Sequence, residues 1–225
     1  MQSLPRICFI LFLFIIVGPN AWSQASRLFH EAKGYGKNQS FKEYELWRFV
    51  SDNEEFQLKK SGMGWMKHGK GRSTSFKVSL ERGEQLNRVV YFARFRGDLI
   101  LICETTSGEY GGGLVARFNK SSLRRRWQAS VPGFNVARGL MERGTVYVAA
   151  VGFIGKINLD TGKYIWKHDD LYRTYDRSGA FNVFLPPRIK KELVVFREED
   201  VLGRGFDHQM HVNRSTGKIV KVILK

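Results

Sequence analysis

The sequence predicts an all-β protein, a short β-propeller or a partial propeller array of three to four antiparallel blades, preceded by a signal peptide. Three stretches of eleven residues share one register: 117–127 (RFNKSSLRRRW), 156–166 (KINLDTGKYIW) and 211–221 (HVNRSTGKIVK). Around them, short apolar runs rich in β-prone residues alternate with turn residues, and no long amphipathic helix intervenes. A recurring strand–turn–strand unit indicates one small sheet built several times.

The first 25 residues have the layout of a removable secretory signal. Arg6 closes a short basic start, residues 7–17 form an unbroken apolar run of eleven residues, and small residues follow as far as Ala25. A membrane anchor is the other interpretation, but the run falls well short of the roughly 20 residues that span a bilayer. We therefore expect residues 1–25 to be cleaved after Ser23 or Ala25, and the mature chain to be secreted or periplasmic.

Residues 26–88 form an N-terminal segment in which the repeat is not visible, and which could supply a degenerate blade. Within it, residues 41–50 (FKEYELWRFV) fit either a helix or a strand, because Leu46, Phe49 and Val50 do not settle the period. We favour a short helix there, since the Lys and Glu residues suit one and no β-branched run occurs.

From about residue 74 the chain is typical of strands. Residues 75–80 alternate apolar and polar, whereas residues 99–103 form a solid apolar run that indicates a strand buried on both faces, with Cys103 as a small apolar core residue. The cluster Gly111–Gly113 indicates a flexible hairpin or bulge. Further strands are expected over residues 89–95, 114–118, 145–151, 153–159 and 193–196.

The repeated Asn residues set the size of a blade. The interval from Asn119 to Asn158 is 39 residues, close to one four-stranded blade of about 40 to 45 residues. The interval from Asn158 to Asn213 is 55 residues, which fits a blade with an insertion between residues 169 and 181 or around residues 197–207. Each Asn is expected to accept hydrogen bonds from amides two or three residues further on, at a tight turn.

The middle copy resembles the repeat of pyrroloquinoline-quinone-like β-propellers. That family's pattern is Ala-Leu-Asp, two free residues, Thr-Gly, three free residues and a docking Trp, and residues 156–166 match it at Ile157, Thr161, Gly162 and Trp166. Asn158 stands in for Asp and Lys156 for Ala. The first copy has Leu123 in place of Gly, and the last has Lys221 in place of Trp. The resemblance covers residues 89–225 and implies a propeller in which Trp127 and Trp166 wedge between blades.

The resemblance also raises the possibility of enzyme activity. Members of that family hold a quinone and a metal in the central funnel of a full, commonly eight-bladed propeller. This chain is too short for eight blades, so we expect neither a cofactor nor a metal. His208 and His211 would face opposite ways on a strand, which argues against a metal site there. A degenerate quinoprotein-like enzyme or a propeller hydrolase is the alternative, and polar residues converging at the blade axis would favour it.

The charge balance indicates an anionic partner. The chain carries a formal net charge of +16, and removal of residues 1–25 takes away only Arg6 to leave +15. Arg117, Lys156 and His211 share the first place of the repeat and would project alike from successive blades. With Arg124, Arg125 and Arg126 they make the predicted basic band. A generally basic, solvated surface with no chosen partner is the alternative interpretation.

These observations together predict an exported, non-enzymatic binding or scaffold module. Its basic surface would engage a protein or an anionic polymer of the cell envelope, and a nucleic acid is not the expected partner. The predicted organisation is a signal at residues 1–25, an N-terminal segment at residues 26–88 and propeller repeats at residues 89–225.

Overall fold

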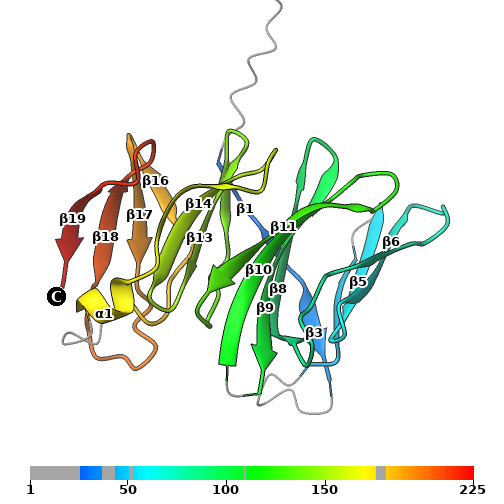
Figure 1. Cartoon of the computed structure of the whole chain (residues 1–225), viewed down its shortest axis with the longest axis horizontal. Helices are drawn as coiled ribbons and strands as arrows, with labels where there is room; N and C mark the ends of the chain where they lie inside the picture. Colours follow the sequence, from blue (N-terminus) through cyan, green and yellow to red (C-terminus); the bar gives the residue numbers. More distant parts are fainter. Residues whose placement is uncertain (1–25, 37–43, 51–52, 109, 176–180) are drawn as a thin grey trace, which may run out of the picture.

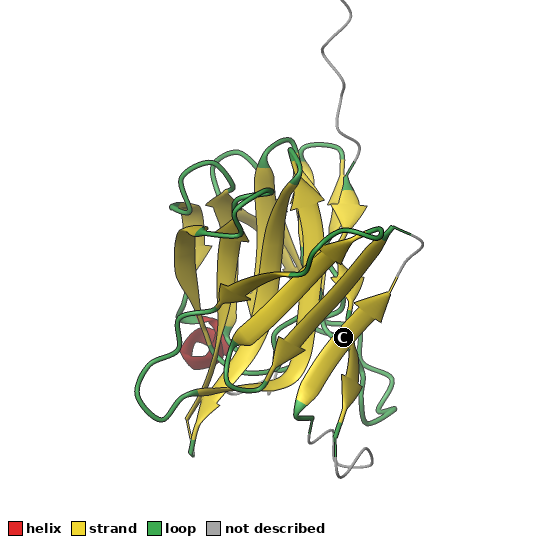
Figure 2. Cartoon of the chain, turned by 90° about the vertical axis from the view of Figure 1, so that its right-hand side faces the viewer, coloured by secondary structure: helices red, strands yellow, loops and turns green. Residues whose placement is uncertain are grey.

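The computed structural model describes residues 26–36, 44–50, 53–108, 110–175 and 181–225, and the predicted signal lies outside these ranges. Strands make up almost all of the regular structure, and the described residues contain one helix, α1 (Leu171–Tyr175) (Figure 2). This helix falls within the insertion expected between residues 169 and 181. None of the described residues belongs to a helix long and apolar enough to cross a membrane.

The strands form four antiparallel sheets, numbered here in chain order. The first sheet contains β3 (Lys33–Tyr35), β4 (Leu46–Val50), β5 (Glu54–Lys59), β6 (Met63–His68) and β7 (Thr74–Lys77). The second contains β2 (His30–Glu31), β8 (Gln85–Phe95), β9 (Asp98–Ser107), β10 (Tyr110–Phe118) and β11 (Arg125–Pro132). The third contains β1 (Arg27–Leu28), β12 (Leu140–Glu142), β13 (Thr145–Ala150), β14 (Phe153–Asn158) and β15 (Tyr164–His168). The fourth contains β16 (Arg188–Lys190), β17 (Leu193–Arg197), β18 (Gln209–Asn213) and β19 (Ile219–Ile223).

The four sheets stand side by side in a row, with the first sheet at one end and the fourth at the other (Figure 1). Each neighbouring pair shares an apolar core, represented by Phe56 for the first pair, Ile102 for the second and Phe196 for the third. In the described part of the chain no such core joins the fourth sheet back to the first. The predicted fold class is therefore confirmed, in its form as an open array of four blades.

The solid apolar run is buried on both faces, as predicted. Residues 98–105 of β9 are all buried, and alternate side chains enter different cores, with Leu101 on one side and Ile102 on the other. Cys103 is fully buried, and this burial raises the pKa of its thiol. β9 is thus the central strand of a sheet packed between two neighbours.

The N-terminal strap, Arg27–Tyr35, runs across one edge of three sheets. Its strands β1, β2 and β3 pair antiparallel with β12, β8 and β4, which are the first strands of the third, second and first four-stranded units. Nine residues of chain extend over only about 30 Å, so these three first-strand edges must lie close together. This edge corresponds to the axis of a propeller, and we call it the axial side.

Residues 46–50 form strand β4, so the predicted helix over residues 41–50 is wrong in its described part; residues 41–43 lie outside the described ranges. β4 pairs with β3 on one side and β5 on the other. Trp47 is 1% exposed, and its ring Nε1 donates a hydrogen bond to the carbonyl oxygen of Arg88 at 3.3 Å. This tertiary pairing outweighs the weak helix propensity of the segment.

The cluster Gly111–Gly113 lies inside β10 and is not the predicted flexible hairpin. A Cβ added at Gly113 would lie 2.6 Å from Val136, and one added at Gly111 would lie 2.9 Å from Phe134. The missing side chains therefore make room for the connector that leads from the second sheet to the third. Room for the side chains of the connector, rather than flexibility, is what these glycines provide.

The repeated Asn has the same geometry in all three copies, as predicted. In Asn119, Asn158 and Asn213, the side-chain Oδ1 accepts hydrogen bonds of 2.8–3.0 Å from the amides two and three residues further on. Gly162 and Gly217 follow at φ of 74° and 77°, a conformation that favours glycine. Each copy is thus a tight corner between the third and fourth strands of its blade.

Candidate functional site

Two residues of the predicted basic band lie between blades. Arg117 is 7% exposed; its Nε donates to Asp98 at 2.7 Å and its Nη1 donates to the carbonyl oxygen of Leu159 at 2.6 Å. Lys156, half-buried, repeats the contact one blade later by donating to the carbonyl oxygen of Arg214 at 2.7 Å. Both carbonyls directly follow the repeated Asn of the next blade. The first place of the repeat therefore ties one blade to the next.

Arg124, Arg125 and Arg126 are exposed, at the turn into β11 and in its first residues. Arg126 pairs with Asp98 at 2.7 Å, and Arg125 contacts Gln128 at 3.4 Å. The structure therefore does not bring the six predicted residues together on one surface.

His211 holds the same repeat position in the last sheet, after which the described chain supplies no further blade. Cross-strand pairing places it in one row across the fourth sheet, with Arg188, Val195, His211 and Lys221. These side chains are exposed or half-buried, whereas the next residue, Val212, is fully buried against the third sheet. The row therefore faces away from the rest of the protein.

The charged side chains of this row are all basic. Lys190 is two residues from Arg188 and so lies on the same side of β16, and the four strands of the sheet contain no Asp or Glu. Burial and the nearby Lys190 and Lys221 lower the pKa of His211. We call Arg188, Lys190, His211 and Lys221 the outward basic face; a hollow of about 310 Å³ opens beside them.

His208 does not share a site with His211. It is buried, and its Nδ1 lies 2.7 Å from the Glu198 carboxylate, which also accepts the amides of Phe181 and Asn182 at 2.6 and 2.8 Å. The pair fastens the connector after α1 to the fourth sheet. Within the described ranges, no three His, Cys, Asp or Glu residues are grouped so as to hold a metal.

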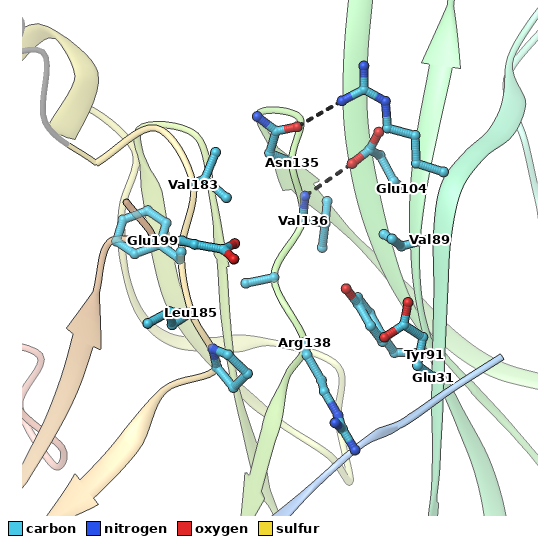
Figure 3. A pocket seen from close by; sticks show the side chains of 14 residues that line it. Glu31, Val89, Tyr91, Glu104, Asn135, Val136, Arg138, Val183, Leu185 and Glu199 are labelled. Atoms are coloured by element: carbon cyan, nitrogen blue, oxygen red, sulfur yellow. Dashed lines mark hydrogen bonds between the residues drawn. The ribbon is translucent and has the colours of Figure 1, made fainter. Parts of the chain in front are cut away.

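A larger hollow, of about 580 Å³, opens on the axial side (Figure 3). One wall comes from the strap and β8 and includes Glu31, Val89 and Tyr91. The opposite wall comes from the connector into the fourth sheet and the turn after β17, and includes Leu185 and Glu199. We call this space the axial hollow.

A β-bulge shapes the first wall. The pairing of β8 with β9 shifts register between Asn87 and Val90, and Arg88 within the bulge has a φ of 26°. Arg88 and Val89 both line the hollow, and Nη1 of Arg88 donates to Oδ1 of Asn135 at 3.0 Å. Bulges of this kind re-aim side chains and are common beside binding sites.

Glu104 is built into the back of the hollow. Its Oε1 accepts a hydrogen bond from Asn87 at 3.0 Å and its Oε2 accepts the amide of Val136 at 3.2 Å. Burial raises the pKa of this carboxyl despite these contacts and the nearby charge of Arg88. Glu104 thus has a structural duty in holding the connector against β9.

Tyr91 is also buried, at 8% exposed. Unlike the carboxylate of Glu104, its hydroxyl has no hydrogen-bond partner among the described residues. Burial raises the pKa of Tyr91, and the carboxylates of Glu31, Glu104 and Glu199 raise it further. The phenol therefore stays protonated at neutral pH and can donate or accept one hydrogen bond in the hollow.

The axial hollow thus gathers polar side chains where the enzymatic alternative would need them. Its lining contains the phenol of Tyr91 and the carboxyl groups of Glu31, Glu104 and Glu199, but no Ser, Thr, Cys, His or Lys. The arrangement suits the binding of a ligand.

Comparison with known proteins adds little to this picture. No family model matches the chain, and no curated protein matches it. A crystal structure of HIRA(644-1017) is similar over 88% of this chain at 8% identity and a TM-score of 0.43; the match spans 56% of the HIRA chain. A crystal structure of Myxococcus xanthus glutaminyl cyclase is similar over 79% of this chain and 71% of its own, at 13% identity and a TM-score of 0.30. Both likenesses are too weak to extend what the four sheets show, and membership of the quinone-type repeat family stays a prediction.

Proposed function

We propose that this protein is an exported, non-enzymatic binding module that holds an anionic polymer of the cell envelope on its outward basic face. The observation that carries the proposal is the charge of the fourth sheet. Arg188, Lys190, His211 and Lys221 lie on one open side of strands that contain no acidic residue. A surface of one sign attracts polyanions over distances of about a Debye length.

The opposite end of the array is a weaker candidate for the same role. The strands of the first sheet also carry Lys59, Lys67 and Lys77, but they include Glu54 and Glu55. One of these carboxylates, Glu55, pairs with Arg48 at 2.9 Å. Each end sheet thus has one arginine paired with a carboxylate, since Arg197 of the fourth sheet pairs with Asp207 at 2.7 Å. Arg188, Lys190 and Lys221 form no ion pair with a described residue, and no carboxylate lies within the strands that carry them.

The repeat supports the view that the outward basic face stays open. In the second and third sheets, a basic residue pairs across strands with a Trp, and both side chains contact the next sheet. In the fourth sheet, Lys221 stands at the Trp position and pairs with His211. An exposed lysine discourages the packing of another sheet. The corresponding turn of the first sheet, residues 69–73 (GKGRS), lacks the Asn that supplies the docking corner. If a second copy packed its first sheet against the fourth sheet of this one, the interface would lack both the docking Trp and the Asn corner that receives it.

The experiment that tests this compares two matched triple variants on a column of immobilised sulfated polysaccharide. R188Q/K190Q/K221Q removes three charges from the outward basic face, and K59Q/K67Q/K77Q removes three from the first sheet. We expect the first variant to elute at clearly lower salt than the second, although their net charges are equal. Equal shifts would mean that only total charge matters, and the proposed face would be abandoned.

The enzymatic alternative has its own readout. A quinone-type enzyme would carry a bound chromophore, so the absorbance spectrum of the purified protein separates that form of the alternative, though not a propeller hydrolase, from the binding module. A bound chromophore would overturn the non-enzymatic proposal whatever the column shows.

A further inference from the structure

We infer that the axial hollow binds a linear aliphatic diamine or polyamine, with one ammonium group between Tyr91 and Glu31 and a second at Glu199. None of the four residues of the outward basic face lines the axial hollow, although the hollow beside that face also borders Leu185 and Pro186, and the axial site selects the opposite charge. The inference is therefore independent of the proposed function.

The first support is the hydroxyl of Tyr91. More than nine-tenths of this residue is buried, yet its hydroxyl meets no hydrogen-bond partner in the described structure and points into the hollow (Figure 3). The hydroxyl is open to the hollow, since no described side-chain N or O atom is both buried and without a partner. A ligand N–H group can donate to the phenol oxygen there.

The second support is a pair of carboxylates without counter-charges. Glu31 and Glu199 enter the hollow from opposite walls (Figure 3), and neither forms an ion pair with any described residue. The guanidinium groups of Arg88 and Arg138 also line the hollow, but neither forms an ion pair with these carboxylates. Both carboxylates lie close enough to Tyr91 for their charges to raise the pKa of its phenol.

The basic residues of the lining already have partners. Arg88 donates to Asn135 at 3.0 Å. Arg138 donates through Nε to the carbonyl oxygen of Phe29, and its side chain runs toward the strap rather than toward Glu199 (Figure 3). Both acceptors are neutral, so the two guanidinium charges remain, but these donors are turned to Asn135 and Phe29. The oxygens of Glu31, Glu199 and Tyr91 are the acceptors that the hollow offers to the N–H groups of a ligand.

The middle of the hollow is apolar. Val136 lies between the two walls, with Val89 on one wall and Val183 and Leu185 beside Glu199 on the other (Figure 3). An alkyl chain packed between these side chains would gain about 0.8 kcal/mol for each buried methylene group. Two charged ends joined by such a spacer describe a linear diamine, and a space of about 580 Å³ is large enough to hold one.

Isothermal titration calorimetry of the whole protein with putrescine tests the inference. The variant Glu199→Gln removes one charge without changing shape, and Tyr91→Phe removes only the unpartnered hydroxyl. The matched control is Glu81→Gln, an exposed carboxylate in the turn before β8 that does not line the hollow. We expect putrescine to bind the wild type, each hollow variant to weaken binding about tenfold, and the control to leave it unchanged.

Three further ligands complete the experiment. Butylamine should bind more weakly than putrescine because it has one ammonium group, and butanediol should not bind because it has none. Gamma-aminobutyrate replaces one ammonium with a carboxylate and should also bind more weakly. Tighter binding of gamma-aminobutyrate would overturn the assignment of a dication, since Arg138 would then be taking part.

Other outcomes also decide the matter. Absence of binding to the wild type, or equal weakening by E199Q and E81Q, would overturn the inference. Tyr91→Phe should unfold at the same urea concentration as the wild type, because no hydrogen bond is lost, so weaker binding by this variant would not reflect misfolding. R188Q/K190Q/K221Q should bind putrescine normally, which keeps this test separate from that of the proposed function.

Discussion

The indole ring of Trp166 lies directly over Gly217 of the next blade. A Cβ added at Gly217 would come within 2.5 Å of the ring, and the ring Nε1 donates to the carbonyl oxygen of Arg214 at 3.3 Å. Trp127 has the same relationship to Gly162, at 2.6 Å for the added Cβ. The Thr-Gly corner of one blade is thus the docking site for the Trp of the blade before it.

This relationship makes Gly217 a point where blade docking can be measured. Gly217→Ala places a methyl group against Trp166 and also holds alanine at a φ of 77°, so we expect a loss of about 2–4 kcal/mol in the free energy of unfolding. Gly203→Ala is the matched control, because Gly203 has a φ of 62° but nothing within 4 Å of an added Cβ. Urea denaturation should show a loss of only about 1 kcal/mol for the control; equal losses would show that Trp166 does not depend on Gly217.

Arg117 should matter for stability in a way that the neighbouring exposed arginines do not. Arg117→Met removes a partner from Asp98, which is 2% exposed, and we expect a loss of about 2–3 kcal/mol, at the low end for a broken buried pair because Arg126 remains. Arg125→Met should change the free energy of unfolding by less than about 0.5 kcal/mol. A similar loss in both variants would contradict the inter-blade role of Arg117.

Asp98 should also make the fold sensitive to acid. Burial alone would raise its pKa, but the amide of Lys120 and the guanidinium groups of Arg117 and Arg126 together hold the pKa below its ordinary value. A carboxylate with a lowered pKa in the folded state stabilises the fold above its unfolded pKa of about 3.9, and this contribution is lost as the pH falls through the folded pKa. The free energies of unfolding of the wild type and Asp98→Asn, measured from neutral pH downward, should therefore converge in acid. A constant difference would count against the ion pair.

The sequence was sufficient for the repeated corners because their contacts are local. Asn158 binds amides two and three residues away, and that spacing recurs visibly in the chain. The first and last copies depart from the repeat pattern, and the departures fit the places of their sheets in the array. Leu123 stands at the Gly place and packs in the core toward the first sheet, and Lys221 stands at the Trp place in the last described sheet, where it is exposed.

The axial hollow could not be found in this way. Glu31, Tyr91 and Glu199 are far apart in sequence, and no motif or spacing connects them. They meet because the strap crosses the first-strand edges and because a bulge shifts β8, and both are tertiary features. The predicted basic band failed to gather for a related reason. Arg117 shares a repeat position with His211, but the same position is an interface in an inner blade and an open surface in the last one.

The strap should contribute strongly to stability because it closes three sheet edges. Phe29, between β1 and β2, is fully buried in the core shared by the second and third sheets. We expect Phe29→Ala to cost about 3–5 kcal/mol in the free energy of unfolding. Leu28→Ala is the control, because Leu28 is 39% exposed, and it should cost much less. Equal effects by urea denaturation would mean that the strap is not anchored by Phe29.

Binding of an anionic polymer should strengthen as the pH falls, and His211 should be responsible. Burial and then the charges of Lys190 and Lys221 lower its pKa, so the free protein holds His211 neutral near neutral pH. A bound polyanion favours the protonated form, so binding takes up a proton and the affinity rises as the pH is lowered from about 7 to 5, where neither Lys nor Arg titrates.

One added charge near the surface is worth about 1 kcal/mol, which corresponds to an affinity gain of about fivefold. The measurement is the dissociation constant for a sulfated polysaccharide at constant ionic strength, for the wild type and for His211→Asn. The variant should lose the gain in acid while binding almost normally at neutral pH, because an uncharged residue replaces a neutral histidine. If the variant keeps the full gain, another group is titrating and the outward basic face does not bind the polymer through His211.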